Sequence, residues 1–184
     1  MIGHRDPIKA AALAAEIGTN VESGEISAAL KAADIAIFAL PYAATIEVLK
    51  GGYDLSGKII VDISNPITAD FKDLAIGHTT SATEEIQAAA PTAMVVKAFN
   101  TVFANLIQTD ARQGKKIQVF VAGNDTNATT QIRDLARALA FEPQDAGPLT
   151  NSRFLEPIGE MNIHFGFFLG RGPNIAPAWI SVND

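Results

Sequence analysis

Cysteine is absent from this 184-residue sequence, which excludes disulfide bonds, thiolate metal ligands and a thiol nucleophile. No apolar run approaches the roughly 20 residues needed to cross a membrane. The first seven residues lack the basic start and apolar stretch of a secretion signal. Lys and Arg number 14 against 20 Asp and Glu, for a net charge of -6, and they form no basic run. We therefore expect a cytoplasmic protein with no nucleic acid and no membrane among its partners.

The length fits one domain over residues 1–184, and 48% hydrophobic residues can fill its core. The most apolar part is the C-terminal segment 151–184, which holds Phe165, Phe167, Phe168, Leu169 and Trp179. This segment either closes the core of the domain or forms a subunit interface. We favour the interface, and with it a homodimer.

The organising stretch is Lys58 to Pro66, because its β-branched apolar run is typical of a strand buried on both faces. Similar strands are predicted at 35–40, 93–98, 117–122 and 142–145. Helices are predicted between them, with caps at Asp6, Ser23 and Ser81. Strands alternating with helices predict an α/β fold with a parallel, doubly wound sheet.

Four strand ends of such a sheet point the same way, and ligands bind beyond the carboxyl ends of parallel strands. These ends carry polar and ring residues at 40–42, 64–66, 99–101 and 123–125. Such a row suits a planar, uncharged ring with an amide, such as nicotinamide. The alternative is that these residues are only ordinary loop formers, since Asn, Gly and Pro are common wherever a chain leaves a strand.

Five motifs, "IFALPY", "KIIVDISNP", "VVKAFNTV", "QVFVAGND" and "DAGPLTNSRFLEP", occur in an order that resembles the NADP-binding family of the coenzyme F420-dependent NADP reductases. The chain is also similar to the cytosolic domain of the six-transmembrane epithelial metalloreductases. The resemblance implies a Rossmann-like domain that binds NADP. It further implies hydride transfer between NADP(H) and a small-molecule acceptor, namely a deazaflavin, a flavin or a ferric chelate.

The resemblance also implies particular cofactor-binding residues. Arg5 would pair with the 2′-phosphate of NADP through two parallel hydrogen bonds, with His4 beside it. A turn along the ribose and pyrophosphate would consist of Ala39, Leu40 and Pro41. The residues around the nicotinamide would be Asn65, Pro66, Ala98, Phe99 and Asn100.

One departure from the family is that the first strand, the glycine-rich turn and the first helix are missing here. Without that first βα unit, we expect an open edge beside the strand at 35–40. A truncated or degraded start explains this better than a new architecture. We therefore expect NADP to bind weakly or not at all. The competing hypothesis is a non-catalytic Rossmann-like remnant that acts as a binding or dimerisation module.

Hydride transfer requires alignment of two rings and exclusion of water, so no acid or base is obligatory and we assign no catalytic residue. We assign no metal ligand either, because His4, His78 and His164 are far apart in the sequence. Burial or capping explains Asp62 at least as well as catalysis. Glu156 is interpreted as a structural residue that accepts from Arg153 or caps a helix.

Overall fold

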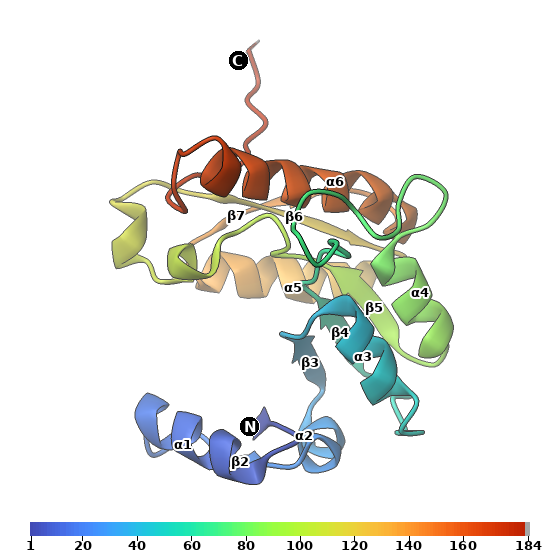
Figure 1. Cartoon of the computed structure of the whole chain (residues 1–184). Helices are drawn as coiled ribbons and strands as arrows, with labels where there is room; N and C mark the ends of the chain where they lie inside the picture. The colour runs from blue at the N-terminus through green and yellow to red at the C-terminus, as the bar shows by residue number, and fades with distance from the viewer. Residues whose placement is uncertain (183–184) are drawn as a thin grey trace.

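The computed structural model describes residues 1–182 and shows a sheet with helices on both faces, beside a smaller N-terminal unit (Figure 1). Its strands are β1 (Ile2–Gly3), β2 (Ser23–Gly24), β3 (Ile35–Phe38), β4 (Ile59–Asp62), β5 (Met94–Lys97), β6 (Gln118–Gly123) and β7 (Glu142–Asp145). Its helices are α1 (Pro7–Ile17), α2 (Ile26–Ala32), α3 (Tyr42–Leu49), α4 (Ala82–Ala89), α5 (Thr126–Ala138) and α6 (Ser152–Ile163). Three 3-10 turns lie at Ala104–Ile107, Asp110–Arg112 and Leu149–Asn151, and a π-helical turn, His164–Phe168, continues α6. None of the helices within residues 1–182 is long and apolar enough to cross a membrane.

Strands β3 to β7 form one five-stranded sheet in chain order. β3, β4 and β5 are parallel, β6 runs antiparallel to β5, and β7 is parallel to β6. The predicted α/β fold is confirmed. The prediction that the loop at 123–125 shares an edge with the other three strand ends is wrong, because Gly123 lies opposite Val96 and the chain then continues toward the start of β5. The physical reason is the connection from β5 to β6, which has two short 3-10 turns in place of the helical crossover that parallel pairing requires.

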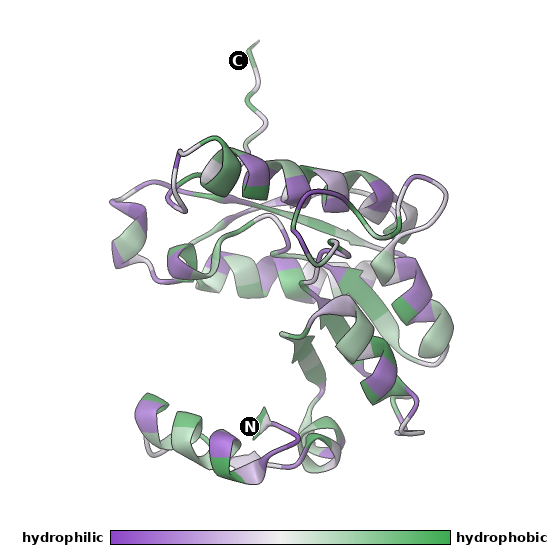
Figure 2. Cartoon of the chain, viewed as in Figure 1, coloured by the Kyte–Doolittle hydropathy of each residue, from purple (hydrophilic) through white to green (hydrophobic). Residues whose placement is uncertain are grey.

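The core follows the alternation of side chains along β4, all of which are buried. Ile59 and Val61 pack with Ile132 of α5 on one face of the sheet. Ile60 packs with Ile86 of α4 on the other face. The apolar character of β3, β4 and β5 is visible in Figure 2. Each of these core side chains is 3% exposed or less, so both faces of β4 are shielded from water.

The N-terminal unit, residues 1–32, consists of α1, α2 and a two-stranded parallel pair of β1 and β2. α1 and the β1–β2 pair lie apart from the sheet (Figure 1), whereas Leu30 of α2 is buried in the same cluster as Phe38 and Ile60. Side-chain hydrogen bonds cross from the sheet through Lys58, whose Nζ donates to the carbonyls of Lys31 and Ala33 at 3.3 and 2.6 Å. β3 is the edge strand of its sheet, as expected, and Ile37 is 51% exposed there.

Helix caps explain where several helices begin. Asp6 accepts from the amide of Ile8 at 3.0 Å, and Ser81 accepts from the amide of Glu84 at 3.2 Å while its hydroxyl donates to the Glu84 carboxylate. Both predicted caps are confirmed. The predicted cap at Ser23 is wrong, because Ser23 pairs with Ile2 in the β1–β2 pair and α2 starts three residues later.

Candidate functional site

The carboxyl ends of β3, β4 and β5 meet at one edge of the sheet, which we call the rim and define as residues 39–41, 64–66 and 98–100. Parallel pairing of these strands sets Phe38, Asp62 and Lys97 side by side as their last residues. The rim follows immediately after them along the chain. This is the position at which open α/β sheets bind their ligands.

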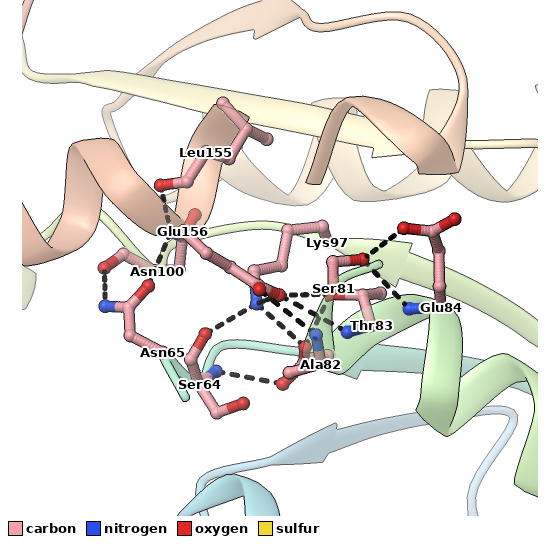
Figure 3. Close-up of polar contacts among 11 residues, drawn as sticks. Ser64, Asn65, Ser81, Ala82, Thr83, Glu84, Lys97, Asn100, Leu155 and Glu156 are labelled. Carbon is pink, nitrogen blue, oxygen red and sulfur yellow. Dashed lines mark hydrogen bonds and ion pairs between the residues drawn. The ribbon is translucent and has the colours of Figure 1, made fainter. Parts of the chain in front are cut away.

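Two asparagines join the second and third loops of the rim. Asn65 Nδ2 donates to the backbone carbonyl of Asn100 at 2.8 Å, and Asn100 Nδ2 donates to Asn65 Oδ1 at 2.9 Å. The two amides face each other in Figure 3. Asn100 Nδ2 also donates to the carbonyl of Leu155 in α6 at 2.8 Å. The rim is thus fixed to the helix above it.

Close packing of α6 against the rim depends on Gly159. A Cβ atom at this position would lie 2.5 Å from the side-chain amide of Asn65, a distance that real Cβ contacts do not show. Asn162 Nδ2 donates to the carbonyl of Thr101 at 3.2 Å one turn later. Helix α6 therefore covers the rim with its backbone in contact with Asn65.

Beneath the rim lies a cluster of three buried charged side chains, Lys97, Asp62 and Glu156. Figure 3 labels Lys97 and Glu156. Lys97 Nζ lies 2.8 Å from Asp62 Oδ2 and 3.0 Å from Glu156 Oε1, and all three side chains are at most 1% exposed. The hydroxyl of Thr83 donates to Asp62 Oδ2 at 2.7 Å. Glu156 accepts from the amides of Ala82 and Thr83 at 3.1 and 3.3 Å. It therefore caps α4 as predicted, whereas Arg153 pairs with Glu84 instead.

The two carboxyl groups of the cluster differ in pKa. Burial opposes ionisation of Asp62, but the charge of Lys97 and hydrogen bonds from Lys97, Thr83 and the Ser64 amide outweigh it, so the pKa of Asp62 lies below its ordinary value. Burial raises the pKa of Glu156, and the attraction of Lys97 does not fully compensate. Glu156 is therefore the carboxyl that takes up a proton first.

The cluster also holds the backbone that leads to Asn65. The amide of Ser64 donates to Asp62 Oδ1 at 2.9 Å, and its carbonyl accepts from Lys97 Nζ at 2.5 Å. Both polar backbone groups of Ser64 are thereby tied to buried charges. The geometry of the rim at Asn65 is consequently set by ion pairing rather than by packing alone.

Tyr42 connects the first loop of the rim to the same region. Its hydroxyl, in the first turn of α3, donates to Glu85 of α4. Burial, followed by the hydrogen bond and the charge of Glu85, raises the pKa of Tyr42 to about 12. The phenol stays neutral near pH 7 and acts as a donor that links the two helices.

Several buried polar atoms at the rim and on α6 lack hydrogen-bond partners within residues 1–182. At the rim they are the hydroxyl of Ser64 and the side-chain carbonyl of Asn100, and on α6 they are both carboxyl oxygens of Glu160. The Ser64 hydroxyl points away from the charged cluster (Figure 3). An orphaned buried polar group needs an explanation, and a ligand is one. A hydroxyl together with a carbonyl acceptor fits the carboxamide of nicotinamide.

The structure brings together most, but not all, of the predicted cofactor residues. Ala39, Leu40 and Pro41 lie at the rim and are exposed or half-buried, as is Asn65, whereas Pro66, Ala98, Phe99 and Asn100 are buried there. His4 and Arg5 follow β1 and therefore belong to the separate N-terminal unit. His4 Nδ1 accepts from the amide of Asp6 at 2.9 Å, and Arg5 is exposed.

Lys97 and Glu160 were missed by sequence reasoning. A signal for Lys97 exists, because a lysine inside the apolar run from Met94 to Ala98 must be buried and paired. Glu160 gives no comparable signal, since a glutamate on a helix is usually solvated. Its burial depends on how α6 lies over the rim.

Comparison with known proteins places this chain in a family. The family model for "NADP oxidoreductase coenzyme F420-dependent" matches residues 1–66. The crystal structure of a predicted F420-dependent NADP reductase from Arthrobacter sp. FB24 superposes with a TM-score of 0.75 at 31% identity, covering 82% of this chain and 71% of that one. The chain belongs to the coenzyme F420-dependent NADP oxidoreductase family. NADP is the cofactor of this family.

Two curated relatives of this family member are named for different electron acceptors. The metalloreductase STEAP3 of Rattus norvegicus is 30% identical over 158 residues, which are 86% of this chain. The F420-dependent NADP reductase of Methanocaldococcus jannaschii is 31% identical over 136 residues, which are 71% of this chain. The chain spans 31% of the length of the first and 60% of the second. Because it covers only part of each relative, family membership shows the fold and the cofactor and leaves the electron acceptor open.

Proposed function

We propose that this protein transfers hydride between NADP(H) and a planar acceptor, a deazaflavin or a flavin, at the rim below α6. A ferric chelate is the alternative electron acceptor, suggested by the metalloreductase relative. Two ferric ions would then each take one electron from NADPH, and one proton would be released. NADPH supplies the hydride when bound. The protein's own part is to orient the nicotinamide, to bring the acceptor against it and to exclude water.

The observation that carries this proposal is the pair of unsatisfied polar groups, Ser64 Oγ and Asn100 Oδ1, at the carboxyl ends of two parallel strands. In a sheet of this class that edge is the ligand-binding edge. Leaving a buried donor or acceptor unpaired costs about 1–3 kcal/mol. The nicotinamide carboxamide offers both a donor and an acceptor and would satisfy these groups.

Arg5 would select NADP over NAD. Its side chain is exposed and makes no hydrogen bond within residues 1–182. The guanidinium is therefore available to bind a phosphate. The sequence between Met1 and Asp184 contains no G-x-G-x-x-G turn for the pyrophosphate. We therefore expect these 184 residues to bind NADPH weakly, with affinity poorer than micromolar.

The decisive experiment is a fluorescence titration of NADPH against wild type, Ser64→Ala and Ser152→Ala. Both hydroxyls are buried and without a partner, but Ser152 lies in the first turn of α6 and away from the rim. Ser64→Ala should weaken NADPH binding about fivefold, the value of one hydrogen bond near 1 kcal/mol. Ser152→Ala should leave binding unchanged. Equal affinities for the two variants would contradict the assignment of the rim.

The acceptor is tested by following NADPH oxidation with a deazaflavin, riboflavin and ferric citrate in parallel. Preference for either ring compound supports hydride transfer to a stacked ring. If NADPH produces no saturable signal at all, the remaining hypothesis is the non-catalytic module, which keeps the fold without the cofactor. In that case the chain should still bind a partner or itself.

We also propose that the protein is a homodimer formed through the C-terminal segment. Within residues 1–182, half of the 16 exposed large apolar side chains belong to this segment: Phe154, Met161, Phe167, Phe168, Leu169, Trp179, Ile180 and Val182. Phe154 and Met161 are seven residues apart on α6, a spacing that suits a helix pair related by a two-fold axis. Light scattering after size exclusion should give a dimer for wild type and a monomer for Phe154→Glu. A wild-type monomer at high concentration would contradict this proposal.

A further inference from the structure

The side chain of Lys97, at the end of β5, is fully buried. An ammonium has three N–H donors, and each of them has an acceptor here: Asp62 Oδ2 at 2.8 Å, Glu156 Oε1 at 3.0 Å and the Ser64 carbonyl at 2.5 Å. All three donors are thus used within the protein. Any effect of Lys97 on a bound cofactor must therefore pass through one of these acceptors.

The Ser64 carbonyl depends on Lys97 more than the two carboxylates do. Asp62 also accepts from the hydroxyl of Thr83, and Glu156 also accepts from two amides at the start of α4. For the Ser64 carbonyl, Lys97 is the only hydrogen-bond donor within residues 1–182. Loss of the ammonium would leave this carbonyl, in a residue that is 7% exposed, without a partner.

Two hydrogen bonds together fix the conformation of Ser64. Its amide donates to Asp62 Oδ1 at 2.9 Å and its carbonyl accepts from Lys97, so the planar peptide groups on both sides of its Cα are held. The backbone that follows is also restricted, because Asn65 precedes Pro66. With both peptide planes held, the bond from Cα to Cβ of Ser64 has one direction. The hydroxyl is thereby pointed away from the charged cluster (Figure 3).

This hydroxyl has no hydrogen-bond partner within residues 1–182. A donor that is already oriented loses less free energy on binding than one that must first be ordered. We propose that Lys97 is a positioning residue, which acts through the Ser64 carbonyl to hold the Ser64 hydroxyl where the nicotinamide carboxamide binds. This rests on the proposed function, which assigns the carboxamide to Ser64. The competing explanation is a structural role, in which Lys97 only compensates the charge of the two buried carboxylates.

The test needs a variant that removes the ammonium without leaving a charge buried and unpaired. A triple variant, Lys97→Met with Asp62→Asn and Glu156→Gln, achieves this because all three new side chains are neutral. The matched control is Lys58→Met, since the Lys58 ammonium also donates to two backbone carbonyls. Lys58 precedes β4, so it lies at the end of that strand opposite to the rim. Circular dichroism and urea denaturation establish that each variant is folded.

The first measurement is a double-mutant cycle on NADPH affinity, obtained by fluorescence titration without turnover. The triple variant should weaken NADPH binding about fivefold, as much as Ser64→Ala does alone. With Ser64→Ala added to the triple variant, the total loss should stay near fivefold and not reach the roughly 25-fold of independent effects. Lys58→Met should bind NADPH as wild type does. Multiplying losses, or wild-type affinity in the triple variant, would overturn the role of Lys97.

The second measurement is the fluorescence lifetime of NADPH at saturation, which lengthens when the nicotinamide ring is immobilised. It uses Lys97→Arg, which keeps the positive charge between the carboxylates but replaces the compact ammonium with a larger planar group. The lifetime should be shorter in Lys97→Arg than in wild type or Lys58→Met. An unchanged lifetime in Lys97→Arg would show that only the charge matters and would refute positioning, even if the triple variant does not fold. Failure of the proposed function differs, because wild type itself would then show no saturable NADPH binding.

Discussion

The rim and the N-terminal unit are built in opposite ways. At and beneath the rim, three buried charged side chains and two asparagines are cross-linked and covered by α6. In the N-terminal unit, α1 buries only Ala10 and Ala14 while Ile8 is 80% and Ile17 is 61% exposed. Rigidity is thus concentrated where a nicotinamide ring would be oriented. The side that would hold the phosphates has little core of its own.

This difference implies unequal local stability, since opening free energies follow the density of buried contacts. Substitutions around the rim should reduce the global free energy of unfolding. Substitutions of similar size in α1 should change only local opening, because α1 contributes no side chain to the buried clusters of the sheet. Pairs of variants that make the same chemical change in the two regions can therefore measure the contrast.

The largest effect is expected for Lys97→Met. It leaves the Asp62 and Glu156 carboxyl groups buried without their cation, which costs about 3–5 kcal/mol of unfolding free energy. Urea denaturation measures this loss. Lys50→Met is the control, because Lys50 is a 65% exposed partner in a surface pair worth at most about 1 kcal/mol. Comparable losses for the two variants would show that the buried cluster is not a structural anchor.

A second contrast compares two isoleucines. Ile60→Ala removes a side chain that is 0% exposed in β4 and should cost about 2–5 kcal/mol. Ile8→Ala in α1 should change stability by less than about 0.5 kcal/mol, because Ile8 is 80% exposed. Thermal and urea unfolding of both variants check this. A destabilised Ile8→Ala variant would mean that α1 packs against something in solution.

Helix caps provide a matched pair with a smaller effect. Ser81→Ala removes the cap of α4 and should lower the global unfolding free energy by about 1 kcal/mol. Asp6→Ala removes the equivalent bond of α1 and should increase amide hydrogen exchange only within residues 7–17. Hydrogen exchange resolved by residue distinguishes the two outcomes. Global destabilisation by Asp6→Ala would contradict the expectation that α1 opens independently of the sheet.

The free energy of unfolding should depend on pH through Asp62 and Glu156, with opposite signs. The pKa of Asp62 is lowered on folding, so its contribution is present above its unfolded pKa, about 4, and is lost as pH falls below that. Asp62→Asn should flatten this acid limb. The pKa of Glu156 is raised on folding, so its contribution to stability is lost as pH rises above about 4. Glu156→Gln should therefore reduce the fall of the unfolding free energy on this higher-pH side. Unfolding measured across pH checks both signs, and identical profiles for the two variants would refute them.

Much of this architecture could be predicted from the sequence, and the failures have physical causes. The run from Ile59 to Asp62 indicates a doubly buried strand, and the spacing of Ser81 and Glu84 indicates a capping box. The reversed direction of β6 could not be predicted, because β-propensity does not encode the direction of a neighbour. The partners of Glu156 and the burial of Glu160 depend on α6 crossing the rim, which local sequence patterns do not specify.

The reversal at β6 determines the direction in which α6 runs. Because β6 and β7 point the other way, the chain leaves them near the start of β5, where Leu149 and Thr150 share a surface with Met94. From there α6 travels up to Thr101 and ends in a ring-bearing π turn. A parallel β6 would have started the helix at the rim and carried Glu160 and the phenylalanines away from it. One inverted strand thus delivers the acidic and aromatic end of the chain to the place where two redox partners would meet.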